Sequence, residues 1–259
     1  MTDATAPASL ALPVRPPIAA IRIGDVFGQA RKIFAAHWAI YSGIVMIAYA
    51  PMLAISARGA LAATPGRAPT GFNFGAPILA SLIGLATLML AHAVVYVSAS
   101  QVVGGRPFSI GQSIGAALRQ SPALIAVVLL TWLYAMFAAL LLVVPAIIVF
   151  CIYAVASPAC VVERIGPIKA MSRSAFLTKG NRWRVFGLMV LLFLVTGLLS
   201  QFVIFLAKLA GGPIFSLVVS APVQGIVGGF SAATIAVLYA KLRIAREGVD
   251  IAHVAAVFD

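Results

Sequence analysis

The sequence predicts an all-α integral membrane protein with six transmembrane helices and three amphipathic helices on the cytoplasmic side. Hydrophobic residues make up 63% of the 259 residues and charged residues only 9%, whereas soluble domains carry about 25% charged residues. So few charged side chains cannot cover a soluble protein of this size. The charge is also uneven, because 18 Lys and Arg stand against 6 Asp and Glu and give a net charge of +12. In a membrane protein this excess is first of all a signal of orientation, so we expect no nucleic-acid partner.

Apolar segments long enough to cross the bilayer locate the six helices. About 20 apolar residues span the hydrocarbon layer, yet the chain from Pro122 to Val162 carries no charge and is about twice that length as a helix. Pro145 is the expected breaker, because proline lacks an N–H and disfavours helix at the preceding residue. The sixth span is expected to begin after Gly211 and Gly212. The predicted spans are residues 38–57, 76–103, 123–144, 146–162, 185–207 and 213–240.

Basic residues indicate the orientation of these spans. Fifteen of the 18 Lys and Arg fall on the side that holds both termini, and Arg58, Arg67 and Lys208 fall on the other. Because basic loops stay in the cytoplasm, we expect a multi-pass protein of the bacterial inner (cytoplasmic) membrane with both termini cytoplasmic. Residues 21–250 then form a single six-span domain. It follows a disordered cytoplasmic tail of residues 1–20, rich in Ala and Pro, and precedes a short cytoplasmic tail of residues 251–259.

Three short amphipathic segments precede the odd-numbered spans. Each begins with the dipeptide Ile-Gly, at residues 23, 110 and 165, and places apolar residues at helical spacing on one face. We interpret them as interfacial helices that lie on the membrane surface. One interpretation is a threefold internal repeat of an interfacial helix plus a helical hairpin. The other is that such linkers are common and the dipeptide is incidental.

Two stretches of sequence carry a resemblance to a known family: SPACVVERIGPIKAMSRSAFLTKGNRWRVFG before the fifth span and LYAKLRIAREGVD at the end of the sixth. The matching features are Pro158, Glu163, the segment Ala170 to Ser174, Leu177, Lys179-Gly180, Trp183, Tyr239, Leu242-Arg243 and Glu247-Gly248. The chain resembles the membrane domain fused to some bacterial glycerophosphoryl diester phosphodiesterases, and the related uncharacterised six-span inner-membrane proteins. This resemblance implies an integral helical bundle. The phosphodiesterase chemistry of the fused members belongs to a separate soluble domain, which this sequence does not supply.

The composition argues against an enzyme. Six acidic residues spread over the chain leave no clustered carboxylates for acid–base chemistry or for a hard metal ion. Three His and two Cys provide no set of ligands for zinc. We therefore expect no catalytic residues, no metal and no cofactor.

The fourth cytoplasmic segment holds the densest group of charges. One acid, Glu163, accompanies six basic residues: Arg164, Lys169, Arg173, Lys179, Arg182 and Arg184. Such a group beside two spans can hold anionic lipid headgroups or a protein partner, or can simply set the orientation of the chain. These three interpretations remain open.

Two further features are candidates for structural roles. Glu163, Arg173 and Glu247 carry opposite charges in the two resembling stretches, which suggests an ion pair between them; two separately solvated faces are the alternative. Gly225 and Gly229 form a GxxxG motif, which lets helices approach closely. That motif can pack within the bundle or against a second copy, so the oligomeric state is left undetermined.

Together these features predict a non-catalytic polytopic inner-membrane protein that contacts anionic lipid or a membrane partner through its basic cytoplasmic helices, in envelope maintenance or assembly. The alternative is a small transporter or channel component, whose discontinuous helices would form at Pro145 and at the start of the sixth span. Against it, His92 is the one histidine expected inside a span, and no second ionisable group lies at similar depth.

The predicted orientation can be tested with alkaline phosphatase fusions, because the enzyme is active only outside the cytoplasm. A fusion after Gly66 should be active and one after Gly180 silent. Phosphatase activity in colonies reports both. The reverse pattern would contradict the topology.

Overall fold

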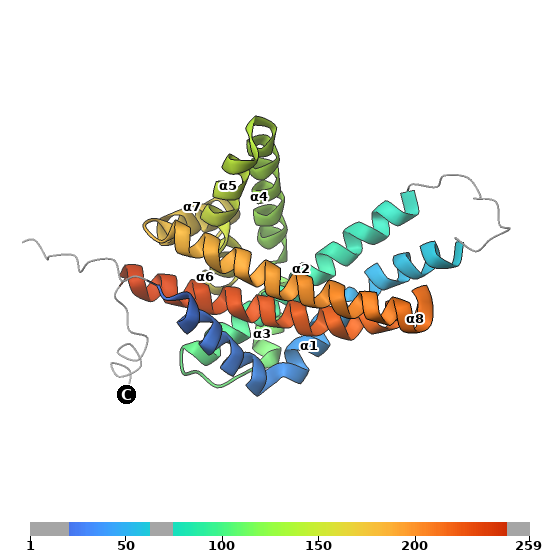
Figure 1. The fold of residues 1–259 in the computed structure, drawn as a ribbon. Helices are drawn as coiled ribbons and strands as arrows, with labels where there is room; N and C mark the ends of the chain where they lie inside the picture. The colour runs from blue at the N-terminus through green and yellow to red at the C-terminus, as the bar shows by residue number, and fades with distance from the viewer. Residues whose placement is uncertain (1–20, 63–74, 248–259) are drawn as a thin grey trace, which may run out of the picture.

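The computed structural model describes residues 21–62 and 75–247, and their regular structure is helical (Figure 1). The helices are α1 Ile23–Ala62, α2 Gly75–Val103, α3 Ile110–Arg119, α4 Ser121–Leu141, α5 Val143–Tyr153, α6 Ala156–Glu163, α7 Pro167–Thr178 and α8 Arg182–Glu247. Within them, six stretches are long and apolar enough to cross a membrane. The predicted all-α fold with six spans is therefore confirmed. The tails predicted at 1–20 and 251–259 lie outside the described residues.

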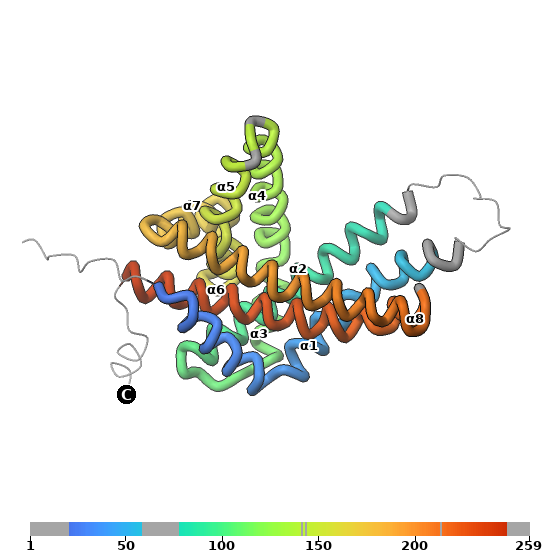
Figure 2. The backbone as a smooth tube through the Cα atoms, in the orientation of Figure 1, coloured from blue at the N-terminus to red at the C-terminus, as the bar shows by residue number. Residues whose placement is uncertain are grey.

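Two of the helices are each divided by a break (Figure 2). α1 departs from helical dihedral angles at His37, with φ −131° and ψ 24°, so residues 23–36 form a separate segment before the first span. α8 breaks at Gly212, with φ 72° and ψ −167°, a conformation that is essentially restricted to glycine. The second break separates the fifth span from the sixth, where the sequence predicted it.

The turn between the third and fourth spans lies at Leu142, and the prediction that Pro145 forms it is wrong. Leu142 has an extended backbone, with φ −170° and ψ 156°, and separates α4 from α5. Pro145 lies in the first turn of α5, where an N–H would have no partner within the helix in any case. The proline therefore helps to begin the fourth span instead of ending the third.

The fourth span has a break that the sequence did not reveal, between α5 and α6. Side chains of α7 satisfy the backbone groups that this break frees. Ser174 Oγ donates to the carbonyl of Ile152 at 2.7 Å and accepts from the N–H of Val155 at 3.3 Å, and Thr178 Oγ1 donates to the same carbonyl at 3.4 Å. Ser174, Thr178 and Val155 are fully buried. This contact docks α7 onto the membrane-spanning part of the chain.

The three segments predicted to be amphipathic correspond to residues 23–36, α3 and α7, and each buries one face against the spans. In α3 the buried face is small, with Ser113, Ala116 and Ala117. The larger Ile114 and Leu118 remain exposed, as expected of an interfacial helix whose apolar side chains contact lipid. Their location at the membrane surface stays a prediction.

The core lies where α1, α2 and the second half of α8 meet. Gly225 and Gly229 of the GxxxG motif face α1 of the same chain. A Cβ added at Gly225 would lie 2.6 Å from the carbonyl oxygen of Ser42, and one at Gly229 would lie 3.2 Å from the carbonyl carbon of Tyr41. Small residues permit this close approach of two helix backbones. In this structure the face formed by the two glycines is thus occupied within the chain.

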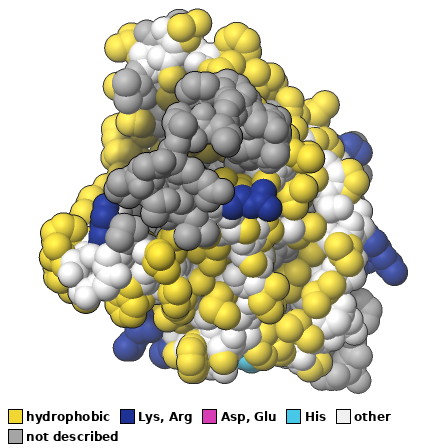
Figure 3. Space-filling view, turned by 90° about the vertical axis from the view of Figure 1, so that its right-hand side faces the viewer, with side chains coloured by type: hydrophobic (Ala, Val, Ile, Leu, Met, Phe, Trp, Pro, Cys, Tyr) yellow, Lys and Arg dark blue, Asp and Glu magenta, His cyan; other side chains and the backbone are white. Residues whose placement is uncertain are grey.

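The hairpin of α4 and α5 projects away from this core (Figure 1), and its outer surface is apolar. Trp132 and Leu140 are 62% and 84% exposed, and Phe193 on the first half of α8 is 74% exposed. Figure 3 views the molecule from the right-hand side of Figure 1. Hydrophobic side chains cover much of the described surface there, with scattered Lys and Arg and no Asp or Glu in view. Apolar surface of this extent is expected where lipid replaces water.

The Gly225 contact predicts a difference between two Gly→Ala variants of α8. Gly225→Ala should destabilise the protein by about 1–3 kcal/mol, because its Cβ cannot fit against the α1 backbone. Gly197→Ala is the matched control, since a Cβ there would meet its nearest neighbour, a side-chain carbon of Phe193, at 4.0 Å. Thermal unfolding in detergent measures both. Equal melting temperatures for the two variants would contradict the packing.

Candidate functional site

Arg173 of α7 is held between two carboxylates that come from two other helices. Its Nε donates to both carboxylate oxygens of Glu163, at 2.9 and 3.0 Å, at the end of α6. Its Nη2 pairs with Oε1 of Glu247 at the end of α8. All three side chains are only about one-fifth exposed, at 21%, 18% and 22%. The structure thus brings together the three residues for which the sequence suggested ion pairing.

Two residues of α8 complete this group, which we call the Arg173 cluster: Glu163, Arg173, Tyr239, Arg243 and Glu247. The Tyr239 hydroxyl donates to Oε1 of Glu163 at 2.6 Å, and Nε of Arg243 donates to Oε2 of Glu247 at 2.9 Å. Two arginines and two glutamates therefore compensate one another in charge. Burial alone would lower the pKa of Arg173, but the hydrogen bonds and charges of both glutamates outweigh it and raise that pKa.

Tyr239 and Arg243 were not assigned a site role from the sequence, although a signal for them exists. Tyr239, Arg243 and Glu247 follow one another at intervals of four residues, which places them on one face of a helix.

A further contact joins α7 to α8 beside the Arg173 cluster. Nε of Arg246 donates to the carbonyl of Phe176 at 3.1 Å, and the Arg246 guanidinium lies 4.8 Å from the centroid of the Phe176 ring.

The other basic residues of the fourth segment have no acidic partner among the residues that the structure describes. Lys169, Lys179, Arg182 and Arg184 are exposed, and Arg184 donates to Oδ1 of Asn181 at 2.9 Å. Arg164 lines a separate pocket. The six predicted residues therefore divide into one paired arginine, four exposed cations and one arginine at a cavity.

An apolar groove of about 450 Å³ lies between α5 and the start of α8, next to Arg182. Arg182 is the one charged residue of its lining. Trp183, which is 85% exposed, lines the groove beside it. The remaining walls are apolar side chains and a thiol: Val144, Ile147, Ile148, Cys151 and Phe186.

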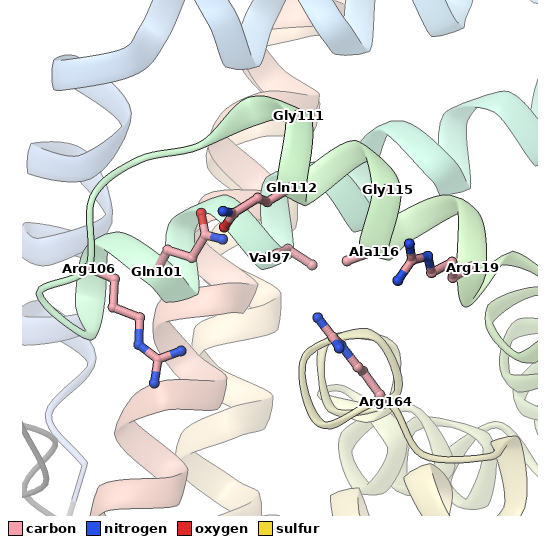
Figure 4. A pocket seen from close by; sticks show the side chains of 9 residues that line it. All are labelled: Val97, Gln101, Arg106, Gly111, Gln112, Gly115, Ala116, Arg119 and Arg164. Atoms are coloured by element: carbon pink, nitrogen blue, oxygen red, sulfur yellow. The ribbon is translucent and has the colours of Figure 1, made fainter. Parts of the chain in front are cut away.

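A second pocket of about 450 Å³ lies among α2, α3 and the end of α6 (Figure 4). It is lined by three arginines, Arg106, Arg119 and Arg164, and by two amides, Gln101 and Gln112. The side chains of Arg119 and Arg164 both extend into the space beneath α3 in this view, and Arg106 lies on the other side of Gln101. No acidic residue belongs to the lining. The sequence placed Arg106 and Arg119 in the orientation signal and did not bring them together with Arg164.

The chemistry that these features offer is the binding of anions. Within residues 21–62 and 75–247, no group of three or more His, Cys, Asp or Glu is placed to hold a metal ion. Four cations outside the Arg173 cluster line cavities instead: Arg182 lines the apolar groove, and Arg106, Arg119 and Arg164 line the second pocket. Both arrangements suit a ligand that carries negative charge, and the groove suits one that also has an apolar part.

Comparison with known proteins gives a family but no described relative. Residues 108–242, just over half of the chain, match the model of a family described as Domain of unknown function (DUF7847). No curated protein and no solved structure matches the chain. The matched range contains Glu163, Arg173 and Tyr239 and ends before Glu247. The resemblance to the membrane domain of glycerophosphoryl diester phosphodiesterases has no named relative to support it and stays a prediction.

The Arg173 cluster predicts a large loss of stability when its central cation is removed. Arg173→Gln leaves two partly buried carboxylates without their shared partner, and we expect a cost of about 2 kcal/mol. Lys169→Gln, on the same helix but exposed and unpaired, should change stability little. Thermal unfolding in detergent measures both. In a double-mutant cycle with Glu247→Gln, strictly additive effects would show that the pair is not coupled.

Proposed function

The chain belongs to the family of unknown function that matches residues 108–242, and from its own geometry we propose that it is a polytopic membrane protein that binds anionic phospholipid beside α7 and the start of α8. The observation that carries the proposal is the apolar groove next to Arg182. A phospholipid is both apolar and anionic, and this groove offers one wall for each part. Binding of this kind requires no reaction, so we propose no catalytic role.

The exposed cations support the binding of a lipid headgroup. Lys169, Lys179, Arg182 and Arg184 have no acidic partner among the described residues, so their charge is available to an external anion. Each basic residue close to an anionic leaflet contributes about 1 kcal/mol. Arginine adds geometry to charge, because its planar fork of N–H groups matches the oxygens of a phosphate.

The apolar groove supports the binding of an acyl chain. Most of its lining from α5 and α8 consists of Val, Ile and Phe side chains, which an acyl chain can contact without losing hydrogen bonds. Trp183 lies next to Arg182, and tryptophan favours the level of the headgroups, where its ring is apolar and its N–H remains wet. An acyl chain in the groove would thus bring its headgroup to Arg182.

The location and process follow from the sequence and are part of the proposal. The asymmetry of basic residues supports a place in the bacterial inner membrane with this basic end in the cytoplasm. A bundle that holds anionic lipid, or docks a membrane partner at the same cations, fits a role in envelope maintenance or assembly.

A small transporter or channel component is the alternative, and one observation favours it. A cavity of about 250 Å³ lies beside His92, between α2 and α4, and the Nε2 of His92 is buried without a hydrogen-bond partner in the described part of the chain. The helix breaks give this alternative less support. Gly212 joins two spans, and the backbone groups freed before α6 already bond to Ser174.

Lipid retention tests the proposal. Native mass spectrometry of the purified full chain should show phosphatidylglycerol retained in preference to phosphatidylcholine. Arg182→Gln should reduce that preference severalfold, and Ile148→Trp should do the same by filling the groove. Lys208→Gln, an exposed cation far from the groove in the sequence, is the control and should have no effect. Equal retention of both lipids would refute the proposal, and solute flux in liposomes would favour the alternative.

A further inference from the structure

We propose that the pocket among α2, α3 and the end of α6 is a binding site for a phosphate group, held by Arg106, Arg119 and Arg164. The pocket is separate from the apolar groove, which lies between α5 and α8 and shares no lining residue with it. The proposal stands on the charges of the pocket, on the backbone of Arg164 and on the space that two glycines leave open.

The charges of the pocket are all of one sign. Arg119 and Arg164 both extend into it beneath α3 (Figure 4), and neither they nor Arg106 pair with an acid among the described residues. All three arginines are exposed, and guanidinium groups of like charge beside one cavity repel one another. An anion between them reverses the sign of this interaction. A phosphate has enough oxygens to accept from more than one guanidinium fork at once.

The backbone of Arg164 is held in a conformation that suits glycine better. With φ 54° and ψ 42°, it is the one non-glycine residue with positive φ in the described chain. Glycine commonly occupies this left-handed position at the end of a helix, because a Cβ is unfavourable there. An arginine at such a position points to a role for its side chain, since an unfavourable backbone often marks a functional site.

Two glycines of α3 leave the pocket open. Gly111 and Gly115 lie one helical turn apart and both line the cavity, and a Cβ on either would meet no atom within 4 Å. Gln101 adds a polar wall. Its Oε1 lies 3.4 Å from the donating Oγ of Ser113, which leaves its amide N–H groups as donors to an oxygen of the ligand.

The same phosphate chemistry can come from a lipid headgroup or from a soluble phosphate, and the test separates the two. The purified full chain is placed in nanodiscs of phosphatidylcholine and titrated with inorganic phosphate, and in nanodiscs that contain phosphatidic acid without added phosphate. A rise in melting temperature reports binding. Saturation by inorganic phosphate identifies a soluble ligand, and protection by phosphatidic acid alone identifies a headgroup.

The variants are chosen so that loss of binding is not confused with loss of folding. Arg164→Gly and Arg119→Gln should each weaken binding about tenfold or more, and Gly115→Leu should do so by filling the pocket. Without ligand, Arg164→Gly should melt at or above the wild-type temperature, because glycine suits the left-handed backbone. Lys208→Gln, which removes an exposed cation outside both the pocket and the apolar groove, should bind like the wild type.

Two results would overturn the proposal. One is that neither inorganic phosphate nor phosphatidic acid raises the melting temperature of the wild-type chain. The other is that Arg119→Gln and Arg164→Gly keep the full effect. Arg182→Gln, which tests the apolar groove, should leave the effect of inorganic phosphate intact, so failure at one site is distinguishable from failure at the other.

Discussion

The guanidinium of Arg173, shared between Glu163 and Glu247, joins three helices at one point. α6 ends the fourth span, α8 ends the sixth, and α7 lies between them as a short helix of twelve residues. Taking charges out of water is costly unless each finds a partner with good geometry. The Arg173 cluster meets this requirement, because its two arginines and two glutamates balance in charge and Tyr239 donates to Glu163 as well. The position of α7 then follows from this network and from the Ser174 contact to the broken fourth span.

Pairing inside the cluster leaves the rest of the basic segment without an acidic partner among the residues that the structure describes. The acids within the described residues are Asp25, Glu163 and Glu247, and the cluster uses the last two. Exposed cations such as Arg182 therefore have their charge open to an anion of the surroundings in the part of the chain that the structure describes. In the proposed function this anion is a lipid headgroup, and the apolar groove next to Arg182 holds the acyl chains attached to it. Ion pairing within the protein and the proposed binding of anions at its surface are in this sense both consequences of the same shortage of acids.

The sequence predicts those parts of the fold that depend on a single length or a single residue type. The thickness of the bilayer sets the length of a span, so hydropathy locates all six, and the restriction of Gly212 to glycine dihedrals locates the turn before the sixth. The ion pairing could also be anticipated, because charges beside a membrane need partners. Pro145 was assigned to the wrong place because the first turn of a helix accepts proline as readily as a turn between helices does. The break before α6 could not be predicted, because Ser174 of α7 satisfies the backbone groups that it frees. The arginine pocket could not be predicted either, because Arg106 and Arg119 line it together with Arg164, which is distant in the sequence.

The end of α6 shows how closely the two kinds of site are connected. Glu163 and Arg164 are neighbours in the chain, yet one belongs to the Arg173 cluster and the other lines the pocket. The left-handed backbone of Arg164 ends α6 immediately after the residue that the cluster holds. Fixing Glu163 therefore also fixes the point from which the Arg164 side chain extends into the pocket. Glycine in place of Arg164 would end the helix more favourably. It would also remove the third cation of the pocket, and with it the one side chain that joins the pocket to the neighbour of Glu163 in the Arg173 cluster.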